Sequence, residues 1–98
     1  MTSKQRSYLK GLAMTMNPSF QIGKSGLTTE IIDAYKEALE KHELLKINVL
    51  KNCEDDIKEL AIAISENTDA EVVQIIGRKI VIYKQAYDPE NRKIQLPR

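Results

Sequence analysis

The stretch EVVQIIGRKIVIYK, residues 71–84, places the tightest constraint on the fold of this chain. Two runs rich in β-branched residues flank Gly77-Arg78, and a glycine at this position suits a tight type II′ hairpin turn. The apolar residues of both runs are consecutive, so neither run alternates as a strand with one wet face would. We therefore expect two central strands that are covered on both faces, by helices on one side and by the N-terminal segment on the other.

Three segments with helical periodicity can supply this cover. The first is capped by Ser3 and runs to about Met14, the second follows a cap at Thr28 or Thr29, and the third has Asp56 near its start. The expected buried stripe of the first helix consists of Tyr8, Leu9, Leu12 and Met16.

Two further strands are expected at SFQI, residues 19–22, and LLKINVL, residues 44–50. The order α-β-α-β-α-β-β contains two β-α-β crossovers, which imply parallel pairing, and a final antiparallel hairpin. The expected fold class is α+β, an α/β-type two-layer arrangement in which helices pack on a mixed four-stranded sheet. Residues 1–98 read as a single domain, with a polar tail at 85–98 in which Ile94 and Leu96 alternate as in a short edge strand.

Composition narrows the class of protein. No apolar run approaches the roughly 20 residues of a membrane helix, so no membrane partner is expected. Cys53 is the only cysteine, which excludes an internal disulfide and suits the cytoplasm. One cysteine and one histidine, His42, also argue against a metal site.

Charge is unevenly distributed along a chain whose net charge is only +1. Residues 1–29 carry +4, residues 30–71 carry −7 and residues 72–98 carry +4. If the two ends meet in the fold, they form a basic face suited to a polyanion. Ordinary solubilising charge explains the same pattern equally well.

The segment QIGKSGLTTE, residues 21–30, contains the letters of a nucleotide-binding loop. The P-loop pattern G-x-x-x-x-G-K-[ST] requires a glycine where this chain has Pro18, so that reading is rejected. A G-x-x-G turn before a helix can instead hold an RNA phosphate through main-chain amides. The alternative is a plain strand-to-helix turn, in which the glycines supply unusual dihedral angles.

The residues give no support for catalysis. His42 lies at a helix end, and the acids lie on helix faces that are expected to be exposed. We expect no catalytic residue, no cofactor, no metal ligand and no small-molecule substrate. The candidate RNA-binding residues are Gly23, Lys24, Ser25, Gly26, Lys4, Arg6, Lys10, Arg78, Lys79, Lys84, Arg92 and Lys93.

Several segments together resemble a known family, namely YLKGLA, FQIGKSGLT, ALEKHELLKINVL, VVQIIGRKIVIYK and KIQLP. Their order and spacing are similar to the CRM domain, the chloroplast RNA splicing and ribosome maturation domain, and above all to its stand-alone bacterial YhbY-like members. The resemblance implies an RNA-binding domain with a fold similar to the C-terminal domain of translation initiation factor three.

The resemblance also implies residue roles. It assigns the RNA-contacting loop to residues 23–26 and basic strand positions to Arg78, Lys79 and Lys84. Many family members have arginine where this chain has Lys84, so a bidentate phosphate contact is not expected there. Met14-Thr15-Met16 stands where many members have a histidine, whose role is not carried over.

The expected function is therefore non-catalytic binding of ribosomal RNA in precursor large-subunit particles during ribosome assembly. The alternative from another class is a protein-interaction adaptor that uses the acidic face of the second and third helices. The sequence does not indicate an oligomeric state.

Overall fold

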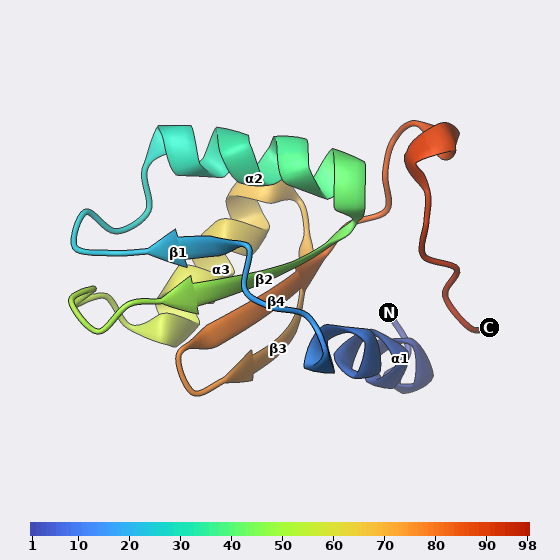
Figure 1. The fold of residues 1–98 in the computed structure, drawn as a ribbon, viewed down its shortest axis with the longest axis horizontal. Coiled ribbons are helices and arrows are strands. Elements are labelled where there is room, and N and C mark those ends of the chain that lie inside the picture. The colour runs from blue at the N-terminus through green and yellow to red at the C-terminus, as the bar shows by residue number, and fades with distance from the viewer.

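The structure, a computed structural model, describes all of residues 1–98. Its helices are α1 (Ser3–Met14), α2 (Thr29–His42), α3 (Ile57–Thr68) and a short 3-10 helix, Pro89–Asn91. Its strands are β1 (Phe20–Ile22), β2 (Leu44–Val49), β3 (Glu71–Ile76) and β4 (Lys79–Tyr83). The element order and the mixed four-stranded sheet confirm the predicted fold class (Figure 1). All of the helices are too short or too polar to span a lipid bilayer.

The strand order is β1-β2-β4-β3, which differs from the predicted pairing. β1 and β2 are parallel as expected, but β2 pairs with β4 rather than with β3, and both pairings of β4 are antiparallel. β4 is therefore the covered central strand, with residues 80–83 all buried, whereas β3 lies at the sheet edge and exposes Ile75 and Ile76. The polar residues Glu71 and Gln74 in β3 are consistent with this edge position.

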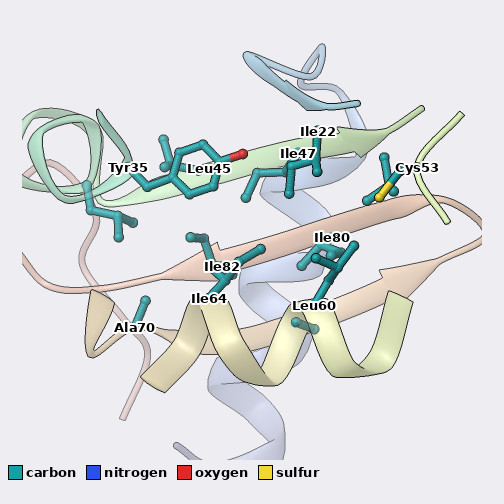
Figure 2. Close-up of a cluster of buried hydrophobic side chains, with 13 residues drawn as sticks. Ile22, Tyr35, Leu45, Ile47, Cys53, Leu60, Ile64, Ala70, Ile80 and Ile82 are labelled. Carbon is teal, nitrogen blue, oxygen red and sulfur yellow. The ribbon is translucent and has the colours of Figure 1, made fainter. Parts of the chain in front are cut away.

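The main core lies between the sheet and the pair α2 and α3 (Figure 2). The largest fully buried side chain is Tyr35, whose ring packs edge-on against Phe20 with centroids 5.0 Å apart. The Tyr35 hydroxyl has no hydrogen-bond partner, and burial raises its pKa to about 12. The hydroxyl therefore stays protonated, and Tyr35 serves the core as an apolar ring.

α1 covers the opposite face of the sheet over a second cluster of six buried residues. The predicted stripe is wrong in two positions, because Tyr8 and Leu12 are exposed and Leu9 and Ala13 are the buried residues of the helix. Ala13 has a small side chain, which lets the helix approach the sheet closely. Lys46 in β2 fixes the helix end, since its Nζ donates to the carbonyl oxygens of Ala13 and Met16 at 3.0 and 3.1 Å.

The tail contains no fifth strand, so the short edge strand expected at Ile94 and Leu96 is absent. Instead, the fully buried carboxylate of Glu43 accepts hydrogen bonds from the N–H groups of Ala86, Lys93 and Ile94 at 2.7 to 2.9 Å. Burial alone would raise the pKa of Glu43, but these three donors and the nearby positive charge hold it below its ordinary value. The tail is thus fastened to the end of α2.

Glu40, one turn earlier in α2, fastens the preceding part of the tail. Its carboxylate accepts from the N–H groups of Tyr87 and Asp88 and from the amide of Asn91 at 2.7 to 3.2 Å. The hydrogen bond from Asp88, followed by those from Tyr87 and Asn91, lowers the pKa of Glu40. Tyr83 lies close by, and burial together with the Glu43 carboxylate raises its pKa.

Candidate nucleic-acid interface

Three connections between elements of secondary structure lie together at one end of the strands of the sheet. β1 and β2 are parallel, so both end there, and β4 is antiparallel to β2, so it begins there. The connections are residues 23–28, residues 50–56 and the hairpin turn 77–78. Figure 1 shows all three at the left of the molecule, away from both termini. We call this end of the molecule the loop edge.

The predicted loop at residues 23–26 is a tight turn closed by a hydrogen bond from Gly26 N to Gly23 O at 3.0 Å. Gly26 has a φ of +68°, which strains any residue with a side chain, and a Cβ there would lie 2.7 Å from a carboxylate oxygen of Asp55, which would have to turn aside. Gly23 needs no such exception, since a Cβ there would make ordinary contacts at 3.6 Å. Of the two glycines, only Gly26 is dictated by the fold.

The two residues between the glycines are exposed, and their main-chain N–H groups are free. No intramolecular hydrogen bond uses the N–H of Lys24 or Ser25. Thr28 then caps α2 by accepting from Ile31 N at 3.2 Å, which places the positive end of the helix dipole just behind the turn. Successive free N–H groups in a turn form an anion-binding concavity, and the helix dipole behind the turn also favours negative charge.

Arg78 has a structural role at this edge. Its guanidinium donates to the carbonyl oxygens of Val49, Leu50 and Cys53 at 2.9, 2.7 and 3.3 Å. The hairpin tip is thereby clamped to residues 50–56, and the turn at 23–26 packs against the same segment. Arg78 therefore positions the loops, which leaves it fewer donors for a phosphate than its sequence position suggests.

Three exposed lysines lie at the loop edge, namely Lys24 and Lys51 in two of the connections and Lys79 as the first residue of β4. None of them forms a salt bridge, so their charges are not neutralised within the molecule. Lys51 is not among the basic residues predicted from the sequence to bind RNA. The predicted parallel pairing of β1 and β2 could have indicated it, because the segments that follow two adjacent parallel strands lie side by side.

The connection at 50–56 also carries acids. Asp56 caps α3 by accepting from Glu59 N at 3.2 Å. The carboxylate of Asp55 lies against Gly26, and Glu54 is exposed beside it. The loop edge therefore has a basic side, formed by the turn tips, and an acidic side at the start of α3.

Five of the predicted basic residues do not join this edge. Arg6 donates to the carbonyl oxygens of Val72 and Val73 and so attaches α1 to the start of β3. Lys4 reaches the carbonyl of Arg98 at 3.2 Å. The others, which lie at the opposite end of the sheet, are Lys84, Arg92 and Lys93. Lys10 lies in the second half of α1, beside Lys46 and Lys79.

Arg92 is also engaged within the tail, because its Nε donates to the carbonyl of Ala86 at 2.9 Å. Its positive charge helps to keep the Glu43 carboxylate ionised. The predicted footprint is therefore divided into two groups, one at the loop edge and one beside the tail. No group of three or more histidine, cysteine, aspartate or glutamate residues is placed to hold a metal ion.

The chain is similar in sequence to known proteins over nearly its whole length. The CRS1 / YhbY (CRM) domain matches residues 1–84. "Probable RNA-binding protein YqeI" of Bacillus subtilis is 41% identical over 97 residues, which span 99% of each chain. An "RNA-binding protein" of Haemophilus influenzae is 40% identical, over 100% of this chain and 96% of the other.

A solved structure is similar as well. The solution structure of the hypothetical protein SAV1595 from Staphylococcus aureus superimposes with a TM-score of 0.80 at 46% identity, and 99% of each chain is covered. These proteins are therefore similar to the chain in sequence, and the solved structure is also similar in fold, over nearly the whole length. The chain belongs to the CRS1 / YhbY (CRM) domain family.

Proposed function

We propose that this chain is a non-catalytic RNA-binding protein whose loop edge holds the sugar–phosphate backbone. The observation that carries the proposal is the turn at residues 23–26, which combines free main-chain N–H groups with an exposed, unneutralised Lys24. Phosphate contacts of this kind set position and orientation without reading sequence. Relatives that span the chain at about 40% identity are named as RNA-binding proteins, which supports RNA as the polyanion.

The finer assignment rests on the family resemblance. We propose ribosomal RNA in precursor large-subunit particles as the target, and the cytoplasm as the place of action. Residues 1–98 would act as one RNA-binding domain, to which Ser25 contributes a hydroxyl donor. Lys10 and Lys79 would extend the contact at the loop edge, and the group beside the tail would meet only an RNA that reaches the opposite end of the molecule.

The salt dependence of binding tests this proposal. A fluorescently labelled fragment of structured ribosomal RNA is titrated with the protein at several salt concentrations. Each phosphate contact adds about 0.7 to 0.9 to the slope of log affinity against log salt, so Lys24→Ala should reduce the slope by about one. Lys41→Ala is the matched control, because it removes the same charge from an exposed salt bridge with Glu37.

Co-sedimentation with precursor ribosomal particles tests the target. The wild-type protein should sediment with precursor large subunits, and Lys24→Ala should be depleted from them. If the wild-type protein binds neither the fragment nor the particles at moderate ionic strength, the proposal is wrong.

The adaptor alternative is favoured by one observation. Ile62 is 57% exposed on α3, on a helix surface that also carries the exposed acids Glu59 and Glu66. A protein partner bound there would tolerate Lys24→Ala and would be lost in Ile62→Asp. A pull-down with both variants separates the two proposals.

A further inference from the structure

A groove lies between the C-terminal half of α1 and the β3–β4 hairpin. Figure 1 shows the hairpin extending beyond the end of the helix, so α1 leaves that part of the sheet face uncovered. The groove has a volume of about 420 Å³. This volume falls within the roughly 300–1,000 Å³ range of sites that hold small molecules and cofactors, and it is sufficient for a nucleoside-sized group.

The walls of the groove combine apolar and amide surface. Met14 is 79% exposed on the helix side and Ile76 is 58% exposed on the hairpin side, while Val81 forms part of the floor. Gln74, which comes directly after a β-bulge, also lines the groove. Its amide offers both a donor and an acceptor. No aromatic side chain is present, so a planar group would pack between aliphatic and thioether surfaces.

The charge of the groove is entirely positive. Its lining includes Lys10 from α1, Lys79 from the start of β4 and Lys46 from the floor, and no carboxylate. Lys46 is committed to α1, because it donates to two carbonyl oxygens at the helix end. Lys10 and Lys79 form no salt bridge and are free to meet an anion at either side of the groove.

The groove adjoins the loop edge at Lys79, which lines the groove and is the first residue of β4. Lys79 follows Arg78, which clamps the segment against which the turn at 23–26 packs. β1 and β4 are separated by β2 alone, so the turn and Lys79 lie about two strand spacings, or about 10 Å, apart across the sheet. A short stretch of RNA strand covers this distance, with Lys51 between the two ends.

We propose that this groove receives one unpaired nucleotide of an RNA whose backbone is held at the loop edge. Lys10 and Lys79 contact its phosphates, and its base packs between Met14 and Ile76 with its edge against Gln74. A base within a continuous helix cannot enter a recess of this kind, so the groove selects RNA with an unpaired residue next to a helix. The inference rests on the proposed function of the loop edge and adds to it a preference for RNA structure.

Two labelled RNA hairpins test the inference. They share one sequence, except that one carries a single bulged nucleotide in its stem. The wild-type protein should bind the bulged hairpin roughly five- to tenfold more tightly. This is the low end of the effect of stacking one base on an aromatic ring, because the groove offers only aliphatic and thioether surfaces. Ile76→Ser should bind both hairpins with the affinity that the wild-type protein has for the fully paired one.

Ile62→Ser is the matched control, because Ile62 on α3 is 57% exposed and Ile76 is 58% exposed. It should retain the wild-type preference, and circular dichroism checks that both variants fold. A 4-thiouridine placed at the bulge should crosslink to Met14, Gln74 or Ile76, as identified by mass spectrometry. A wild-type protein that binds both hairpins equally, a preference retained in Ile76→Ser, or crosslinks confined to other elements would each overturn the inference.

The two proposals fail in different ways. If the wild-type protein binds the paired hairpin and Lys24→Ala weakens that binding, the loop edge is supported whatever the bulge does. If neither hairpin binds, both proposals are overturned together.

Discussion

At the scale of single residues, the two glycines of the turn at residues 23–26 meet different structural requirements. Gly26 has a positive φ and faces Asp55, whereas Gly23 has room for a methyl group. Their equivalence in the G-x-x-G pattern is therefore a similarity of sequence and not of structural requirement.

This difference predicts opposite effects on stability. Gly26→Ala should lower the free energy of unfolding by about 1–3 kcal/mol, because it forces an L-residue into the left-handed region beside a carboxylate. Gly23→Ala should be neutral or raise it by up to about 1 kcal/mol, since alanine restricts the unfolded chain. Urea denaturation of both variants measures the two effects. Equal losses would show that the backbone at Gly23 is also strained.

Residues also mark where the sequence sufficed and where it did not. Asp56 caps α3 as predicted, and Thr28, one of the two predicted candidates, caps α2, because capping depends on local hydrogen bonds. The prediction for α1 was wrong by one residue, since Thr2 and not Ser3 is the cap. The buried side of α1 was misjudged, because Tyr8 and Leu12 follow the same spacing as Leu9 and Ala13. Neighbouring stripes on a helix differ by only about 100°, and tertiary contacts decide between them.

At the scale of elements, the loop edge is assembled by contacts that no local pattern encodes. The hairpin turn was readable from Gly77, whose φ is +56°, but the use of Arg78 as a clamp depends on β4 lying beside β2. The sequence held a signal for the strand order. β4 has four consecutive apolar residues, all of them buried, whereas β3 contains two polar residues, as suits a strand at the edge of the sheet. The predicted basic residues divide into two groups for the same reason, since strand direction decides which end of the sheet each one occupies.

The clamp predicts that charge alone cannot replace Arg78. Arg78→Ala should lower the free energy of unfolding by about 2–3 kcal/mol, because three carbonyl oxygens lose a charged donor. Arg78→Lys keeps the charge but cannot reproduce the planar fork, so it should recover less than half of the loss. Chemical denaturation measures both variants. Full recovery by lysine would mean that Arg78 acts as a charge and not as a clamp.

At the scale of the whole molecule, the attachment of the tail to α2 depends on pH, because it depends on the ionised carboxylate of Glu43. Its pKa is lowered in the folded state, so its stabilising effect is present above the ordinary glutamate pKa of about 4.3 and is lost as the pH falls through the folded value. Glu40 has the same sign. The free energy of unfolding should therefore decrease as the pH is lowered below about 5.

Glu43→Gln isolates this contribution. An amide has only one acceptor oxygen and turns an N–H group toward the backbone donors of the tail, so we expect a loss of about 1–3 kcal/mol at neutral pH. The variant should also show a shallower loss of stability in acid. Glu37→Gln, at an exposed salt bridge on the same helix, is the control and should change stability by less than about 0.5 kcal/mol. An unchanged acid profile in Glu43→Gln would contradict the assignment.

The distribution of charge over the whole molecule gives the last prediction. The loop edge and the tail lie at opposite ends of the sheet, and the longest axis measures 38 Å. Two double variants remove the same charge from these two ends, namely Lys51→Ala/Lys79→Ala at the loop edge and Lys84→Ala/Lys93→Ala at the tail. Any effect of net charge is therefore equal in both.

The expected effects on binding differ. With an RNA hairpin much shorter than the longest axis, the loop-edge variant should lose roughly tenfold or more in affinity and reduce the salt slope by about two, because both lysines would contact phosphates. The second should bind within about twofold of wild type, since a short RNA held at the loop edge does not reach the tail. Equal losses in the two variants would place the contact across both ends, and a loss confined to the second would move the interface to the tail.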